Sequence, residues 1–135
     1  MKSLKLYTDG GSRGNPGPSA GAFVICDLED NVVEKTGFFI GSGTNNIAEY
    51  TALSRGLAHC QKLGAEQLSV HLDSELVVRQ LNGEYKVKNA QLKPLYEQVK
   101  KLAQGFRQIE FKHVPREQNH LADTELNRVL DENSR

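Results

Sequence analysis

The chain is predicted to form a mixed α/β fold, with one five-stranded mixed sheet flanked by helices in the order βββαβααβα. Three observations predict it. Residues 4–40 read as three strands separated by turns, which indicates an antiparallel meander. Beyond them, segments with helical spacing alternate with short apolar runs of strand length. A length of 135 residues, with 38% hydrophobic and 25% charged residues, fits one globular domain over residues 1–135.

The first three strands follow from alternation and from the turns that bound them. Residues 4–9 alternate between apolar and polar side chains, as a half-buried strand does. Residues 10–18 are rich in Gly and Pro, so we expect a loop there rather than regular structure. Residues 20–27 and 32–40 read as the second and third strands, joined by a turn at Asp30.

The rest of the chain alternates between helix and strand. Asn45 or Asn46 is expected to cap a first helix, and Gly64 is placed to end it. Pro115 is expected to bound the last helix on its N-terminal side. The later elements expected are a strand at 68–72, helices near 74–81 and 90–104, a strand near 108–113 and a final helix over about 118–130.

Composition limits the classes of protein that need to be considered. No apolar run approaches the roughly 20 residues that span a membrane. The N-terminus leads directly into a strand pattern without a secretion signal, so we expect a cytoplasmic protein. We also expect a monomer. Cys26 and Cys60 are expected to be core thiols in a reducing compartment, with a disulfide between them left open. The net charge of zero neither indicates nor excludes a nucleic-acid partner.

Four acidic residues stand in settings that indicate a metal site. Asp9 and Asp73 end strand-like segments, and Glu49 and Asp123 lie near the starts of helix-like segments. If the first and fourth strands are neighbours, Asp9 and Asp73 lie at corresponding ends, where open sheets bind ligands. Clustered carboxylates require neutralisation, and hard cations such as Mg²⁺ prefer oxygen ligands. Two such ions about 3.5–4 Å apart can clamp both oxygens of a phosphodiester displacement.

Each of these residues also has an ordinary structural interpretation. Asp9 before Gly10 could belong to a turn. Glu49 could be a solvated helix residue, and Asp73 could cap the helix that follows it. These interpretations stay open for each residue taken singly.

Taken together, four segments closely resemble the motifs of type 1 ribonuclease H in order and spacing. The resemblance covers essentially the whole chain and implies a ribonuclease H-like fold. It also implies cleavage of the RNA strand of RNA–DNA hybrids with two Mg²⁺ or Mn²⁺ ions, held by the carboxylates of Asp9, Glu49, Asp73 and Asp123. The matching segments are Tyr7-Thr8-Asp9-Gly10-Gly11-Ser12 with Gly14-Asn15-Pro16-Gly17, Thr44-Asn45-Asn46 with Ala48-Glu49, Leu72-Asp73-Ser74, and His113-Val114-Pro115 with Glu117, Asn119 and Ala122-Asp123.

The same resemblance implies a set of substrate contacts. Asn15, Asn45 and Asn46 match positions that read the minor groove of the hybrid on its RNA side, where amides can bind 2′-hydroxyls. Thr44 and Asn89 match positions that hold a phosphate of the DNA strand. The backbone at Gly11 and Ser12 is expected to approach the ribose-phosphate chain closely, as glycine allows. The implied substrate-binding set is Gly11, Ser12, Asn15, Thr44, Asn45, Asn46 and Asn89.

The chain departs from the family pattern in three places. Arg116 stands seven residues before Asp123, where some members carry a loop histidine. We predict that Arg116 acts electrostatically in catalysis, because a guanidinium does not exchange protons near neutral pH. Residues 82–89 replace a basic, tryptophan-bearing protrusion, so the chain resembles the handle-less form found in many prokaryotes. Residues 124–127 also differ, so the last helix is expected to pack slightly differently.

Two classes of function remain from the sequence. The first is a metal-dependent endoribonuclease that leaves 5′-phosphate and 3′-hydroxyl ends. The second is a nucleic-acid-binding module of the same fold that has lost catalysis. Retention of all four carboxylates favours the enzyme, because a binding module has no reason to keep a repulsive cluster.

Overall fold

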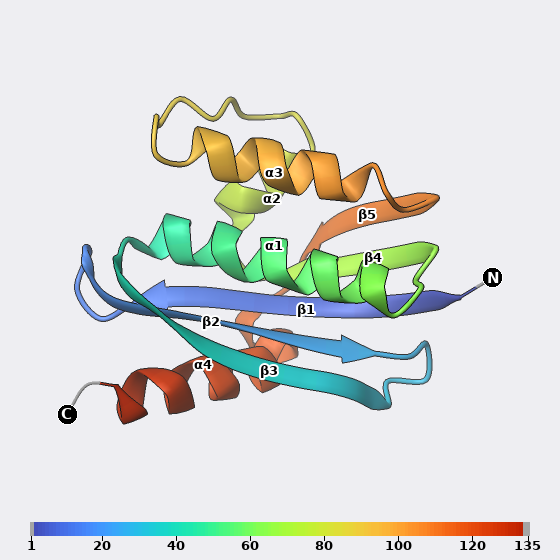
Figure 1. The fold of residues 1–135 in the computed structure, drawn as a ribbon, viewed down its shortest axis with the longest axis horizontal. Coiled ribbons are helices and arrows are strands. Elements are labelled where there is room, and N and C mark those ends of the chain that lie inside the picture. The colour runs from blue at the N-terminus through green and yellow to red at the C-terminus, as the bar shows by residue number, and fades with distance from the viewer. Residues whose placement is uncertain (1, 134–135) are drawn as a thin grey trace.

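The computed structural model describes residues 2–133 and confirms the predicted fold class (Figure 1). Five strands form one mixed sheet in the order β3-β2-β1-β4-β5. The elements in chain order are β1 (Ser3–Ser12), β2 (Gly17–Cys26), β3 (Val32–Gly43), α1 (Asn45–Lys62), β4 (Gln67–Leu72), α2 (Glu75–Leu81), α3 (Lys93–Ala103), β5 (Gln108–His113), the 3₁₀ turn η1 (Arg116–Asn119) and α4 (His120–Glu132).

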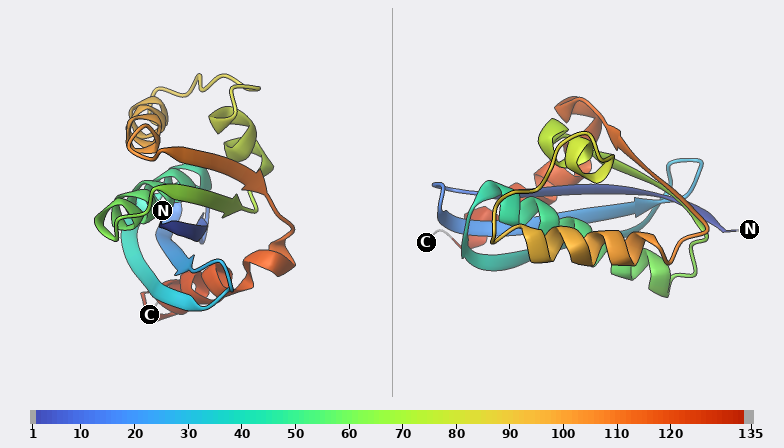
Figure 2. Two further views of the ribbon diagram at one scale, coloured as in Figure 1. Left: turned by 90° about the vertical axis from the view of Figure 1, so that its right-hand side faces the viewer. Right: turned by 90° about the horizontal axis from the view of Figure 1, so that it is seen from above.

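The sheet combines both kinds of strand pairing. β1, β2 and β3 form the predicted antiparallel meander, while β1 pairs with β4 and β4 with β5 in parallel. Figures 1 and 2 show α1 and α3 on one side of the sheet and α4 on the other. The strand ends of β1 and β4 therefore lie between α1 and α4, which contribute residues from opposite faces.

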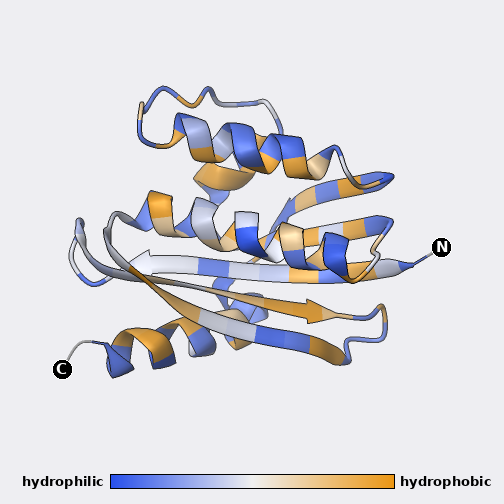
Figure 3. Ribbon diagram, in the orientation of Figure 1, coloured by the Kyte–Doolittle hydropathy of each residue, from blue (hydrophilic) through white to orange (hydrophobic). Residues whose placement is uncertain are grey.

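Apolar side chains hold these layers together. The main core joins the α1 face of the sheet to α1, α2 and α3 through residues such as Leu6, Leu53, Val70 and Val99, each of which is fully buried. A smaller cluster packs α4 against β2 on the other face. Figure 3 shows the corresponding pattern on α4 and α3, where apolar stripes alternate with polar ones.

The prediction of a loop over residues 10–18 is wrong for much of its length. β1 continues through Ser12 and β2 begins at Gly17, because the backbone from Gly10 to Ser12 pairs with residues 19–21. Only residues 13–16 form the connection. Local glycine content suggested a loop, but strand pairing with a distant segment decides the structure. β3 likewise runs to Gly43 rather than to residue 40.

Three predicted helix boundaries also need correction. Thr44, rather than Asn45 or Asn46, caps α1: its Oγ1 accepts a hydrogen bond from the Ile47 amide at 3.3 Å. α3 begins at Lys93 rather than near residue 90, because Asn89 Oδ1 accepts from the amides of residues 91 and 92 in a separate turn. α4 begins at His120 and ends at Glu132, preceded by η1.

Two remaining expectations concern cysteines and membranes. Cys26 and Cys60 are both buried free thiols, so no disulfide joins them. Within residues 2–133, none of the helices has the length and apolar character needed to cross a membrane.

Candidate active site

Asp9 and Asp73 lie side by side because of the parallel pairing of β1 and β4. Thr8 and Leu72 form the last pair of that ladder, and the next residue in each chain segment is an aspartate. Asp9 and Asp73 are neighbours as predicted, but only Asp73 follows the end of its strand, because β1 continues past Asp9 to Ser12 in its pairing with β2. Asp73 does not cap α2, because Ser74 Oγ accepts from the Val77 amide at 3.3 Å and takes that role.

Glu49 reaches the same place because α1 lies directly on β1. A Cβ atom at Gly10 would stand 2.3 Å from the carbonyl carbon of Ala48 and 2.4 Å from the amide nitrogen of Glu49. Only glycine permits this approach of two backbones. Glu49 is consequently buried, with 7% of its surface exposed, and is not a solvated helix residue.

Three of the predicted carboxylates form a compact group. Asp9, Glu49 and Asp73 each offer an oxygen, and the three oxygens lie within 4.8 Å of one another. An ion takes such ligands at roughly 2–2.6 Å, so oxygens on opposite sides of one ion lie about 4–5 Å apart. Glu49 Oε2 is also buried without a hydrogen-bond partner. The donor set and this unpaired oxygen fit a divalent cation.

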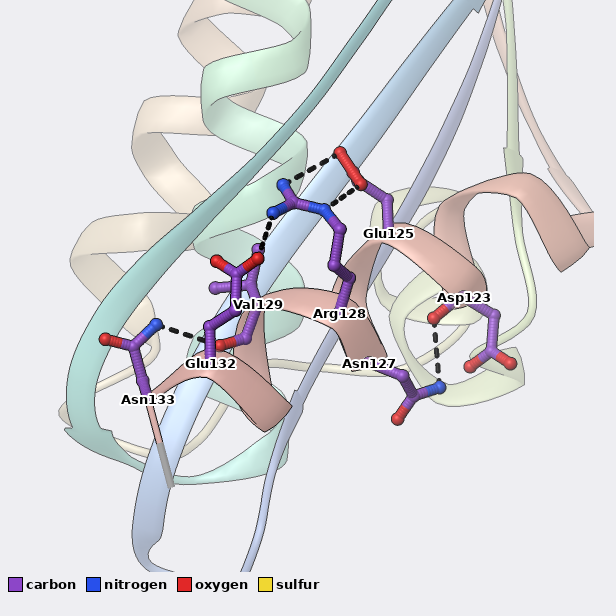
Figure 4. A network of polar contacts seen from close by, with 7 residues as sticks. All are labelled: Asp123, Glu125, Asn127, Arg128, Val129, Glu132 and Asn133. Atoms are coloured by element: carbon purple, nitrogen blue, oxygen red, sulfur yellow. Dashed lines mark hydrogen bonds and ion pairs between the residues drawn. The ribbon is translucent and has the colours of Figure 1, made fainter. Parts of the chain in front are cut away.

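Asp123 enters the site from the other face of the sheet, on the first turn of α4. It lines the same cavity, and its Oδ1 forms an ion pair with Arg116 Nη2 at 3.3 Å. Figure 4 shows Asp123 and Asn127 together on α4, apart from the Arg128 network with Glu125 and Glu132. The structure thus brings all four predicted carboxylates to one cavity, with Asp123 at its α4 wall.

Burial and mutual repulsion raise the pKa values of two of the carboxylates. Burial, the charge of Asp73 and contact with Asp123 raise the pKa of Asp9 to about 8. Burial and the charges of Asp9 and Asp73 raise the pKa of Glu49 well above its usual range. Placing these groups together therefore costs stability unless protons or a cation neutralise them.

The cavity over these carboxylates has a volume of about 430 Å³. Gly11, Ser12, Asn45 and Arg116, predicted from the sequence, line it with the four acids. Leu126, Asn127 and Leu130 also line it and were missed, although they follow Asp123 at spacings of three, four and seven residues. That helical spacing is the signal that could have identified them. Gly10 and Arg13 complete the lining of this cavity.

The remaining predicted substrate residues surround a second cavity of about 250 Å³. Asn15, Thr44, Asn45, Asn46 and Asn89 all line it. Thr44 Oγ1 and Asn89 Oδ1 already accept backbone hydrogen bonds, so their hydroxyl hydrogen and amide group are the donors left to face a ligand.

Asn45 connects the two cavities. Its Oδ1 accepts from the backbone amide of Ser12 at 2.9 Å and from Ser12 Oγ at 3.2 Å, while its own backbone amide donates to Asn15 Oδ1 at 3.1 Å. These three hydrogen bonds tie the end of β1 and the β1–β2 connection to the start of α1. The NH₂ group of the Asn45 side-chain amide is then the group that can donate to a ligand.

A five-stranded mixed sheet with carboxylates on its two adjoining central strands, completed by carboxylates on helices from both faces, defines a ribonuclease H-like protein. The sequence profile of the reverse transcriptase-like family matches residues 7–129. The chain therefore belongs to the reverse transcriptase-like family, and the resemblance of its motifs to type 1 ribonuclease H is confirmed by relatives of that kind.

Two relatives illustrate the similarity in sequence. The chain is 37% identical over 129 residues to ribonuclease HI of Halobacterium salinarum, covering 96% of this chain and 65% of that protein. It is 46% identical over 127 residues to the bifunctional protein Rv2228c of Mycobacterium tuberculosis, covering 93% of this chain. The chain spans only 35% of the length of Rv2228c.

Solved structures match the fold closely. The N-terminal RNase H domain of Rv2228c superposes with a TM-score of 0.95 at 41% identity, covering 98% of this chain and 96% of that one. LC11-RNase H1, solved in complex with an RNA/DNA hybrid, gives a TM-score of 0.91 at 40% identity, covering 96% of this chain and 97% of that one.

Proposed function

We propose that the chain is an endoribonuclease that hydrolyses the RNA strand of RNA–DNA hybrids, using two Mg²⁺ or Mn²⁺ ions and leaving 5′-phosphate and 3′-hydroxyl ends. The observation that carries this proposal is the group of Asp9, Glu49 and Asp73 oxygens within 4.8 Å of one another. Similarity to LC11-RNase H1, solved with a hybrid, supports the substrate.

In this proposal, Asp9, Glu49, Asp73 and Asp123 hold the cations. When bound, the cations supply a nucleophilic water and neutralise charge on the departing oxygen. The protein contributes a fixed carboxylate set on two neighbouring central strands and two helices, which needs little rearrangement before reaction.

Arg116 is proposed to act on charge rather than on protons. Its guanidinium lies beside Asp123 at the edge of the cavity and is largely exposed, so it is free to turn toward a phosphate. A charge-assisted contact there stabilises the extra negative charge that develops during attack.

The second cavity is proposed to hold the hybrid in register. Asn15, Asn45 and Asn46 present amides to 2′-hydroxyls and base edges of the RNA strand. Thr44 and Asn89 present donors that suit a phosphate of the DNA strand.

The test is cleavage of an end-labelled RNA–DNA hybrid with Mg²⁺ and with EDTA. We expect cleavage only with the ion, and loss of cleavage in Asp9→Asn and Asp73→Asn, because an amide is a weaker neutral ligand. Asp30→Asn is the matched control, because Asp30 is an exposed partner of Lys5 away from the cavity. Near-normal turnover in either site variant with saturating Mg²⁺ would rule out the two-metal proposal, and hybrid binding without any cleavage by the parent would favour the binding-module alternative.

A further inference from the structure

Asn119, at the junction between η1 and α4, is a buried polar residue that the proposed chemistry does not use. It is 1% exposed and belongs to no cavity wall of the carboxylate site. Its Nδ2 donates to the backbone carbonyl of Thr8 at 2.8 Å, across 111 residues of sequence. Its Oδ1 is buried without a hydrogen-bond partner.

The orientation of this amide follows from its partner. A carbonyl oxygen can only accept, so the nitrogen of the side chain must face Thr8. The unpaired Oδ1 then carries an unfavourable desolvation. Packing alone does not favour a buried amide whose nitrogen has a hydrogen-bond partner and whose oxygen has none. This imbalance points to a role for the contact with Thr8 itself.

The two ends of this contact adjoin two of the proposed metal ligands. The Thr8 carbonyl immediately precedes Asp9 in the chain, at the last residue of β1 that pairs with β4. Asn119 lies four residues, about one helical turn, before Asp123. Asp123 in turn is close enough to Asp9 to raise the pKa of that carboxyl. One hydrogen bond, from the Asn119 side chain to the Thr8 carbonyl, thus joins the two chain segments that carry Asp9 and Asp123.

We propose that Asn119 is a positioning residue whose side-chain amide holds the start of α4 against β1 at Thr8, where the pairing with β4 stops, and so sets the spacing between the Asp123 and Asp9 carboxylates. A neighbouring contact supports the same closure, because the Val114 amide donates to the Leu72 carbonyl at 2.8 Å. Residues 114–119 therefore bind the backbone of both central strands, at Thr8 of β1 and Leu72 of β4. This inference rests on the proposed function for its catalytic consequence.

The test compares Asn119→Ala with Gln61→Ala. Gln61 makes the same kind of contact elsewhere, because its Nε2 donates to the Leu102 carbonyl at 2.6 Å and ties α1 to α3. Both variants lose a side-chain amide that joins two elements, but only Asn119 adjoins the carboxylates. Unfolding midpoints measured first set an assay temperature at which both variants are folded.

We expect Asn119→Ala to lower kcat for hybrid cleavage by roughly 10- to 100-fold, with the KM for hybrid changed by less than about twofold. Calorimetric titration with Mn²⁺ in the absence of hybrid should show weaker binding by roughly 10-fold or more. Gln61→Ala should match the parent in both measurements. Equal kcat and equal Mn²⁺ affinity in the two variants would overturn the positioning role.

A measurement on the parent protein keeps the proposal testable if Asn119→Ala does not fold. The Asn119 side-chain amide protons should exchange with solvent more slowly in NMR spectra than those of Asn82, whose exposed side chain donates to Phe111 at 3.3 Å. Exchange as fast as that of Asn82 would overturn the inference. If the parent itself fails to cleave hybrids, the proposed function fails, while the Mn²⁺ titration still decides whether Asn119 positions the carboxylates and the exchange experiment whether its amide holds Thr8.

Discussion

Replacing Asp9 by Asn is expected to stabilise the metal-free protein at neutral pH while removing its activity. Burial and the neighbouring carboxylates raise the pKa of Asp9 from 3.8 to about 8 in the folded state. At pH 7 the unfolded chain is ionised at this position, about three pH units above its own pKa. Each pH unit corresponds to about 1.4 kcal/mol, so the raised pKa of Asp9 lowers the free energy of unfolding by up to roughly 4 kcal/mol at pH 7. Asn carries no charge and avoids this loss.

The pH dependence follows from the direction of the shift. Because the folded pKa of Asp9 is above the unfolded one, the folded state binds more protons between about pH 4 and pH 8. The free energy of unfolding of the parent should therefore fall as pH rises through that window. Below about pH 4 the two states bind the proton equally, so the advantage of Asp9→Asn should disappear there.

The assay is urea unfolding in EDTA at several pH values, with Asp30→Asn as the charge-matched control. We expect a gain of about 2–4 kcal/mol for Asp9→Asn at pH 7 and little gain at pH 4. Mg²⁺ should stabilise the parent more than the variant, because a ligand stabilises the state that binds it. A variant less stable than the parent at pH 7 in EDTA would refute the electrostatic reasoning.

Four further predictions concern the site. Gly10→Ala should destabilise the fold by about 1–3 kcal/mol or more and reduce turnover about 100-fold. The reason is that β1 and α1 must separate by about 1 Å, the difference between 2.3 Å and an ordinary contact of 3.4 Å. Thermal melts check the loss of stability, with Gly11→Ala as the control because its added Cβ meets only ordinary contacts. Asn45→Ala should weaken hybrid cleavage with little change in Mg²⁺ affinity by calorimetry. Arg116→Ala should lower turnover by roughly 10- to 1000-fold, with part of the activity kept in Arg116→Lys; parental activity in Arg116→Ala would make the residue a solvated charge. The KM for hybrid should rise steeply with salt, because phosphate contacts release counterions.

The carboxylate site could be predicted largely because its residues stand next to alternating strand segments or near helix starts, and these positions show in local patterns. Asp9 and Asp73 follow alternating segments, and parallel pairing then places them together. The cap of α1 was misassigned because Thr44, Asn45 and Asn46 are all good capping residues. Choosing among them requires knowing that Asn45 Oδ1 is already engaged by Ser12, a contact across 33 residues.

The features that the sequence did not predict depend on packing between distant segments, which no local pattern records. The extension of β1 past Gly10 requires pairing with residues 19–21 and contact with the α1 backbone. Asn119 belongs to a recognisable motif, but its burial and its bond to Thr8 emerge only when α4 docks on the sheet. Tertiary contacts, rather than propensity, determined these features.

The docking of α4 on the face opposite α1 has a consequence for how the protein matures during synthesis. Asp9, Glu49 and Asp73 are carried by β1, α1 and the end of β4, whereas Asp123 is made fifty residues later. A nascent chain that has exposed only the first three carboxylates lacks both the α4 wall of the cavity and Arg116. The proposed nuclease activity should therefore switch on late in translation, once α4 has left the ribosome and packed beneath the sheet.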